Sequence, residues 1–262
     1  MATESNLSAK LARQATNRET RTVLDEISAI EPEIARSLQS EAGAATLVRH
    51  YYSAVRFNPL LMECTSSSLV AALLLSAQCR LEPGPLGHVY LVPFRNTNAG
   101  TVEVVWMLGY TGIVELARRG GAEGCRSTVV WDCDETVAPW EDEKGLHWRL
   151  KPGPLADRGD RVGVLVSWRE GRERQALLCP PSRVDVAIRT SKNPYARELR
   201  EEDWYWRKTG IRYARPWLPL ATDSGQTFAI ADRSDGGVVT GYTSSLDMGV
   251  EATLEQGEVD PQ

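Results

Sequence analysis

The sequence predicts an α+β fold: an antiparallel β-sheet core with helices before and after it. Apolar residues recur at helical spacing over residues 24–79, alternate at the two-residue period of strands over residues 88–179, and return to helical spacing over residues 181–215. Short polar turns between the strands favour antiparallel pairing. We therefore expect three parts: an N-terminal helical region (1–80), an α/β core ending in a basic helix (81–220) and a disordered acidic tail (221–262).

The N-terminal region is expected to hold four short helices. Two are indicated by Leu24, Ile27, Ile34 and Leu38, with Pro32 in the first turn of the second. The third carries apolar and aromatic residues at i, i+3, i+4 and i+7 over residues 48–55. The fourth, residues 69–79, is apolar nearly all round, which predicts a buried helix capped by the serines at 66–68.

A rigid turn, "LEPGPLGHVYLVPF", connects the fourth helix to the first strand. Pro83, Gly84 and Pro85 predict a turn of type II, with Gly84 at positive φ. His88 lies alone between the turn and the strand, and nothing nearby offers it a reaction. We expect it to cap or hydrogen-bond within the turn.

The strands of the core are predicted from alternating apolar residues, and the ends of its elements from Gly and Pro. Pro93 is expected to end the first strand, and Pro216 and Pro219 to close the last helix. In chain order we expect strands at 88–94 and 102–110 around a polar loop at 95–100, a helix at 113–119 stopped by Gly120 and Gly121, strands at 128–133, 146–150, 161–168 and 173–179, and helices at 181–189 and 201–215 around a loop at 191–195.

Composition excludes several classes of protein. The longest strongly apolar run, residues 69–75, is too short to cross a bilayer, and residues 1–10 carry no apolar signal, so we expect a cytoplasmic protein. The five cysteines are widely spread without a C-x-x-C pair, which favours buried reduced thiols over disulfides or a zinc site.

Charge is distributed unevenly along the chain. The net charge is −5, yet residues 221–262 hold eight acidic residues and one Arg. The remaining 220 residues hold 29 basic and 27 acidic residues. Four basic residues and no acid fall between Trp204 and Trp217, so a local basic element stands out from a near-neutral body.

Catalytic motifs are absent from the sequence. There is no phosphate-binding G-x-x-x-x-G-K-[ST] loop, no G-x-G-x-x-G, no G-x-S-x-G and no H-E-x-x-H. Carboxylates cluster at residues 132–135 and 141–143. They could hold the metal ions of a nuclease, but their consecutive spacing around Pro139 is more typical of a solvated loop.

The last helix offers the best candidate binding surface. At 100° per residue, Lys208, Arg212 and Arg215 fall on one narrow arc, while Trp206 and Tyr213 lie on another that can pack on the core. Gly210 would allow a close approach to that core. Three aligned cations suit a run of backbone phosphates, although a solvated basic face would give the same pattern.

Two further surfaces are candidates. Arg118 and Arg119 close a helix, where cations also complement the helix dipole. The hairpin loop carries Arg95, Asn96 and Asn98. Aromatic rings near them could stack on bases, but Trp106 and Tyr110 are equally plausible core residues.

Three blocks of the chain resemble the RecT family of single-strand annealing recombinases. They are "LEPGPLGHVYLVPF", "LGYTGIVELARRGG" and "WRKTGIRYARPWLPL", in the family's order and at comparable separations. The segment "SSSLVAALLLSAQCRLEPG" is similar to the family's sequence ahead of its turn. The resemblance runs from about residue 24 to residue 220 and leaves the acidic tail outside it.

The resemblance implies an ATP-independent, phage- or prophage-encoded protein that coats single-stranded DNA in the bacterial cytoplasm and pairs it with its complement. It further implies a core related to that of other annealing proteins and assembly into rings or helical filaments. The implied partners are single-stranded and annealed duplex DNA, a 5′-to-3′ exonuclease and the host single-strand binding protein. No cofactor is expected to be required, with magnesium assisting annealing, and no catalytic residue is expected. Two alternatives to annealing stay open: a metal-dependent nuclease that uses the carboxylates of residues 132–143, and a passive binder of single-stranded DNA.

The sequence departs from the family in the two blocks that carry charge. Thr111 stands where the family often has a Lys or Arg, and the last helix keeps one Arg of the usual A-I-R-R. Pro216 also shortens that helix. DNA binding is therefore expected to depend on the following residues: Lys208, Arg212 and Arg215, with Arg207, Arg118 and Arg119 in support, and Arg95, Asn96, Asn98 and Tyr110 as further candidates.

Overall fold

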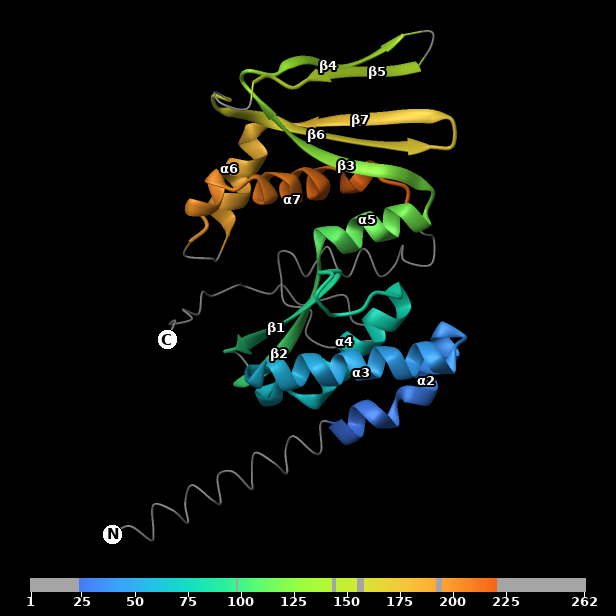
Figure 1. The fold of residues 1–262 in the computed structure, drawn as a ribbon. Helices are drawn as coiled ribbons and strands as arrows, with labels where there is room; N and C mark the ends of the chain where they lie inside the picture. Colours follow the sequence, from blue (N-terminus) through green and yellow to red (C-terminus); the bar gives the residue numbers. More distant parts are fainter. Residues whose placement is uncertain (1–23, 98, 143–144, 155–157, 192–194, 221–262) are drawn as a thin grey trace, which may run out of the picture. The chain divides into compact units, whose positions relative to one another are not determined.

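The computed structural model describes residues 24–220, except residues 98, 143–144, 155–157 and 192–194. The described residues form two compact units, one ending at Gly109 and the other beginning at Tyr110 (Figure 1). Helices and antiparallel strands make up both units, so the predicted α+β class is confirmed. The division at residues 80 and 220 remains a prediction, and the acidic tail lies outside the described residues.

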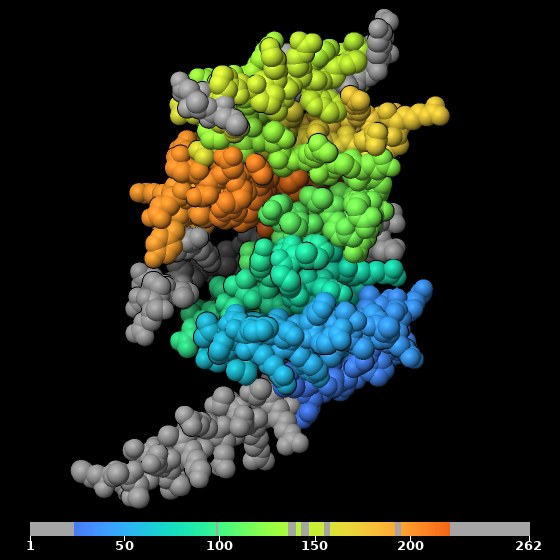
Figure 2. All heavy atoms as spheres, viewed as in Figure 1, coloured from blue at the N-terminus to red at the C-terminus, as the bar shows by residue number. Residues whose placement is uncertain are grey.

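The first unit begins with the expected helices. Residues 24–29 are helical, followed by α2 (Glu31–Leu38), α3 (Glu41–Phe57), the short 3₁₀ helix η1 (Pro59–Glu63), which the periodicity did not predict, and α4 (Ser66–Cys79). Ser40 caps α3 by accepting a hydrogen bond from the Gly43 amide at 3.0 Å. The cap of α4 is Thr65 rather than the serines at 66–68, which belong to the helix. Figure 2 shows α3 on the face of this unit that is turned to the viewer.

A buried polar cluster fixes α3, α4 and the hairpin against one another in this unit. The Ser76 hydroxyl lies 2.9 Å from the Tyr51 hydroxyl and accepts a 2.8 Å hydrogen bond from Trp106 Nε1. All three side chains are buried, and burial raises the pKa of Tyr51 well above its ordinary value. Because every member has a partner, the cluster specifies the packing of α4 on the strands.

The hairpin of the first unit corrects one expectation from the sequence. It consists of β1 (Val89–Asn96) and β2 (Thr101–Leu108), and Pro93 pairs with Val104 inside β1 instead of ending it. These two strands form a sheet by themselves, and among the described residues the outer edge of β1 is bridged at Val89, by Pro83, and not at Pro93, so a residue without an N–H is tolerated there.

The rigid turn before β1 also differs from the prediction. Gly84 does not adopt a positive φ; Gly87 does, at 67°, and its amide donates to the Gly84 carbonyl at 3.0 Å. A Cβ on Gly109 would lie 1.9 Å from the Gly87 carbonyl oxygen, so this turn and the end of β2 need two glycines. The imidazole of His88 has no hydrogen bond among the described residues; its carbonyl accepts from the Gly109 amide at 2.9 Å. The hydrogen bond predicted for the His88 side chain within the turn is therefore not found among the described residues, and its backbone is bonded to the end of β2 instead.

The second unit is built around a three-stranded antiparallel sheet. After α5 (Tyr110–Arg119), the strands β3 (Ala122–Trp131), β6 (Arg161–Glu170) and β7 (Glu173–Cys179) pair in the order β3-β6-β7. A separate hairpin, β4 (Glu135–Asp142) with β5 (Gly145–Lys151), lies next to β7 (Figure 1). The chain then forms α6 (Pro181–Thr190), η2 (Glu198–Glu201), α7 (Asp203–Ala214) and η3 (Arg215–Trp217).

Helix α7 packs across all three strands of the sheet. A Cβ on Gly210 would lie 2.6 Å from Val164 Cγ1, which confirms the close approach predicted for this glycine. The alternation predicted for β6 holds for Val164, Val166 and Trp168, which are buried, but Val162 is exposed. Within residues 24–220, apart from the gaps stated above, no helix is long and apolar enough to cross a membrane.

Candidate nucleic-acid interface

Helix α7 is held rigidly by its buried face. Tyr205, Trp206 and Ile211 are buried, and Trp206 Nε1 donates a 2.7 Å hydrogen bond to the Arg200 carbonyl. Tyr213, predicted to share the packed face with Trp206, is only half-buried. The rotation of the helix about its own axis is therefore fixed by the buried side chains of Tyr205, Trp206 and Ile211 and by the contact at Gly210.

The predicted cations line the other arc of α7 and the turn that follows it. Lys208, Arg212 and Arg215 are half-buried, and Arg207 is exposed. The ammonium of Lys208 lies 5.5 Å from the centre of the Tyr205 ring, a distance at which a cation is attracted to the ring face. Burial raises the pKa of Tyr205, and the charge of Arg212 acts in the opposite direction. The cations are thus partly ordered by the protein, which the sequence pattern alone did not indicate.

The basic pair that ends α5 is already occupied by an acid. Arg118 donates two hydrogen bonds of 2.8 Å to Glu115, and Arg119 donates one of 2.9 Å. The hydrogen bond from Arg118, with that from Arg119, lowers the pKa of Glu115 to about 2. Glu115 was missed in the sequence, although its spacing of three and four residues from the two arginines is the signal for such pairs in a helix.

The ends of α5 and α7 lie close together in the second unit. A Cβ on Gly120, just after α5, would lie 2.1 Å from the carbonyl oxygen of Pro219. The segment following Arg215 therefore runs against the turn that follows Arg118 and Arg119. The structure brings the two predicted basic elements to one part of the unit.

The third predicted surface, on the hairpin of the first unit, is more limited. Arg95 is exposed on β1, and no ion pair holds it among the residues that the structure describes. Both ends of the Asn96 amide are engaged within the hairpin: Nδ2 donates to Glu103 and Oδ1 accepts from the Ala99 amide, each at 3.1 Å. Asn98 lies outside the described residues.

The two aromatic candidates differ in availability. Trp106 is a core residue, buried and hydrogen-bonded to Ser76. Tyr110 is half-buried and is the first residue of α5, which begins three residues earlier than predicted. Tyr110 is therefore the one of the pair whose ring is partly accessible.

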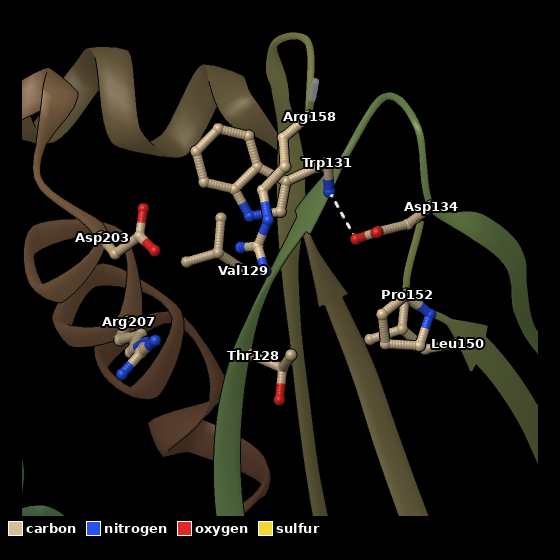
Figure 3. A pocket seen from close by; sticks show the side chains of 9 residues that line it. All are labelled: Thr128, Val129, Trp131, Asp134, Leu150, Pro152, Arg158, Asp203 and Arg207. Atoms are coloured by element: carbon tan, nitrogen blue, oxygen red, sulfur yellow. Dashed lines mark hydrogen bonds between the residues drawn. The ribbon is translucent and has the colours of Figure 1, made fainter. Parts of the chain in front are cut away.

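A cavity of about 180 Å³ next to Arg207 was not predicted (Figure 3). Arg207 and Asp203 of α7 form one side, Leu150 and Pro152 form the opposite side, and Trp131 and Arg158 lie at its end. The guanidinium carbon of Arg158 lies 5.3 Å from the centre of the Trp131 ring. No periodicity marks Arg158, because it lies in the segment between β5 and β6.

The carboxylates considered for a nuclease lie in the turn after β3 and in β4, and Glu143 lies outside the described residues. Residues 135–142 form strand β4, so the predicted solvated loop is wrong for that part of the chain. Glu135 pairs with Lys151 at 3.3 Å, Asp142 pairs with His147 at 2.8 Å, and Asp134 accepts the Trp131 and Gly153 amides at 2.9 Å. In the part of the chain that the structure describes, no group of three or more His, Cys, Asp or Glu is placed to hold a metal ion.

The cysteines are buried or half-buried free thiols. Burial raises the pKa of Cys64, Cys125 and Cys179 to about 11. Protonated thiols are poor nucleophiles and poor metal ligands, so at neutral pH these three side chains act as small apolar residues.

The sequence is similar to known proteins over most of the residues described above. The model of the RecT family matches residues 45–235. Protein RecT of Escherichia coli (strain K12) is 28% identical over 234 residues, which cover 83% of this chain and 85% of that protein.

The matched segment contains both units' hairpins, α5, α7 and the cavity. It also extends beyond residue 220, where the resemblance seen in the sequence was expected to end, and so includes the beginning of the acidic tail. Family membership supports a role in recombination by annealing of single strands. Because the family model matches well over half of its length, the chain belongs to the RecT family.

Proposed function

We propose that the protein binds single-stranded DNA and anneals complementary strands without ATP. The observation that carries this proposal is a row of cations: Lys208 and Arg212 follow one arc of α7, which Gly210 fixes against Val164, and Arg215 continues the row at the start of η3. Contacts to phosphates hold a strand without reading its sequence, because they leave the base edges free to pair. A helix that supplies such contacts therefore suits annealing of any sequence.

The proposal includes the partners expected of an annealing protein. The chain would assemble with copies of itself into a ring or filament, receive single strands from a 5′-to-3′ exonuclease, and meet the host's single-strand binding protein on the DNA. Magnesium would assist annealing by screening the phosphates of the two strands.

An annealing assay tests the proposal. Two complementary oligonucleotides, one with a donor dye and one with an acceptor, are mixed with the full chain in magnesium buffer without ATP. We expect duplex to form faster than in the absence of protein, from strands that stay intact on a denaturing gel. Lys208→Ala with Arg212→Ala should slow annealing. The matched control, Arg172→Ala with Arg174→Ala, removes the same charge from exposed residues at the β6–β7 turn and should not.

Each other outcome identifies an alternative. Shortened strands in magnesium would indicate a nuclease. Strands that are protected but pair no faster would indicate a passive single-strand binder. Equal slowing by both double variants would show that net charge, and not α7, determines the rate.

A further inference from the structure

The cavity beside α7 combines features that a chain of phosphates alone would not need. Its volume is about 180 Å³, and its walls differ in character. Arg207 and Arg158 contribute positive charge, Trp131 contributes an aromatic ring, and Leu150 and Pro152 contribute apolar surface (Figure 3). Positive charge next to an aromatic and apolar wall fits a ligand that is itself anionic at one end and aromatic at the other.

The carboxylates of the cavity are already engaged. Asp134 Oδ2 accepts the Trp131 amide and Oδ1 accepts the Gly153 amide, each at 2.9 Å. Asp203 Oδ1 accepts from Arg161 Nε at 3.0 Å. Arg161 has a side chain only 15% exposed and is also paired with Glu201, so the charge of Asp203 is balanced by a fixed partner.

The guanidinium groups of the cavity are differently placed. Among the residues that the structure describes, neither Arg158 nor Arg207 is in an ion pair. Arg207 is exposed and Arg158 is half-buried. With respect to that part of the chain, both can bind an anion, and each guanidinium can donate two parallel hydrogen bonds to the oxygens of a phosphate.

The Trp131 ring supplies the second half of the site. It is half-buried, with the fixed Arg161 guanidinium carbon 4.5 Å from the ring centre and Arg158 at 5.3 Å. Because no carboxylate of the described residues forms an ion pair with Arg158, its guanidinium can move from the ring toward a phosphate when a flat ligand takes its place. Nucleobases stack on such aromatic rings whatever their sequence.

We propose that this cavity takes one unpaired nucleotide of the bound strand, with its phosphate at Arg158 and Arg207 and its base against Trp131, Leu150 and Pro152. A base within a duplex is stacked and paired, so it cannot enter. The cavity would thus favour single strands over duplex and would release its nucleotide when the complement pairs. This proposal depends on the proposed function, since it assumes that single-stranded DNA binds to the second unit.

Removing the base while keeping the phosphates tests the subsite. The full chain and its variants are titrated with a dye-labelled oligo(dT) and with an abasic strand of the same length. The wild-type chain should bind oligo(dT) about tenfold more tightly than the abasic strand, as expected for stacking of a base on an aromatic ring. Trp131→Leu should reduce that ratio to about twofold and leave the affinity for the abasic strand unchanged, whereas Trp140→Leu, on an exposed ring outside the cavity, should keep the wild-type ratio.

A second pair of variants avoids any risk to the Trp131 packing. Pro152 and Pro154 are both exposed and two residues apart, but only Pro152 lines the cavity. Pro152→Glu places a negative charge on the wall of the cavity that the base contacts, opposite Arg207, where it repels the phosphate of the bound nucleotide. It should weaken binding of both probes at least fivefold, while Pro154→Glu should not change it.

The outcomes separate this proposal from the proposed function. A wild-type chain that binds neither strand would overturn both. A chain that binds oligo(dT) but shows equal effects of Pro152→Glu and Pro154→Glu would overturn the subsite alone. The subsite would also be overturned if Trp131→Leu left the ratio of the affinities for oligo(dT) and the abasic strand unchanged, or if Trp140→Leu reduced that ratio equally.

Discussion

Helices α5 and α7 both end in basic residues in the second unit, yet the structure uses their charges differently. In α5, one acid occupies both arginines: Glu115 accepts hydrogen bonds from Arg118 and Arg119. In α7 the basic residues follow one another without an acid from Trp204 to Trp217. Two of the three acids that directly precede this stretch, Glu201 and Asp203, pair with Arg161.

The difference shows that a pair of basic residues is not by itself a phosphate site. A guanidinium that must leave a carboxylate before it meets a phosphate gains only the difference between the two interactions. On α7, the ammonium of Lys208 lies against the ring of Tyr205, and the row of cations contains no acid of its own helix from Trp204 to Ala214. We therefore expect α7 to contribute more to DNA binding than α5.

The largest expected effect comes from displacing α7 as a whole. Gly210→Ala puts a methyl group 2.6 Å from Val164 Cγ1 and 3.2 Å from Ser127 Oγ, and β6 is too well packed to move away. The higher helix propensity of Ala offsets up to ~1 kcal/mol of the cost of this clash. We expect a net loss of about 1–2 kcal/mol in the free energy of unfolding. DNA affinity should fall with it.

Chemical denaturation and oligonucleotide titration measure the two effects of Gly210→Ala. Gly84→Ala is the control, because its new methyl group would meet no atom within 4 Å and its φ is not positive. Equal stability of the two variants would show that the contact at Gly210 does not position α7.

Releasing the arginines of α5 should sharpen the comparison. Glu115→Gln removes the negative charge that accepts hydrogen bonds from Arg118 and Arg119, so a phosphate no longer competes with this carboxylate for them. Binding of single-stranded DNA should tighten and its salt dependence should steepen by up to about 1.4 in the logarithmic slope, since each phosphate neutralised on a single strand contributes roughly 0.7. An unchanged slope would place α5 outside the DNA-binding surface.

The acidic tail gives a smaller effect that is confined to low salt. Truncation after Asp235 removes five acids and no basic residue while keeping the whole segment that the family model matches. If the tail competes with DNA for the cations, the truncated chain should bind more tightly at low ionic strength and equally at high ionic strength, because screening removes the competition. A second truncation, after Leu220, removes the whole acidic tail and is measured beside the first. If neither truncation changes the affinity for DNA, the tail serves only to keep the protein in solution.

The smallest expected effect is on stability in acid. The pKa of Glu115, lowered to about 2 by Arg118 and Arg119, lies below the ordinary value of about 4.3 for an unfolded chain. The ion pairs therefore contribute fully above about pH 4.3, and the contribution is lost as the pH falls to about 2. Unfolding midpoints of the wild type and Glu115→Gln should converge across this range; a difference that grows toward low pH would contradict the assignment.

Most of the fold could be predicted because its elements bury one face at a regular period. Helices α3 and α4 and strands β6 and β7 follow directly from that periodicity. Strand β4 could not be predicted, because its carboxylates and Pro139 are typical of a loop and its pairing with β5 is what stabilises it. The positive φ was assigned to Gly84 rather than Gly87, since the close approach to Gly109 is a tertiary contact.

The candidate site was predicted only where it follows from a single helix. The arc of Lys208 and Arg212 and the role of Gly210 follow from helical geometry. The ion pairs of Glu115 with Arg118 and Arg119 could have been predicted, because the three residues are three and four positions apart in a helix. The cavity could not, because Trp131, Arg158 and Arg207 come from three segments that only the folded chain brings together.

The salt dependence of single-strand binding tests the central claim most directly. The logarithm of the affinity for one oligonucleotide is measured against the logarithm of salt concentration for Lys208→Ala with Arg212→Ala and for Arg118→Ala with Arg119→Ala. Both variants remove two positive charges. We predict that the α7 variant lowers the slope by about 1.4 and the α5 variant by less than half as much. Equal slopes in the two variants, or a larger loss from α5, would contradict the assignment of α7 as the principal DNA-binding element.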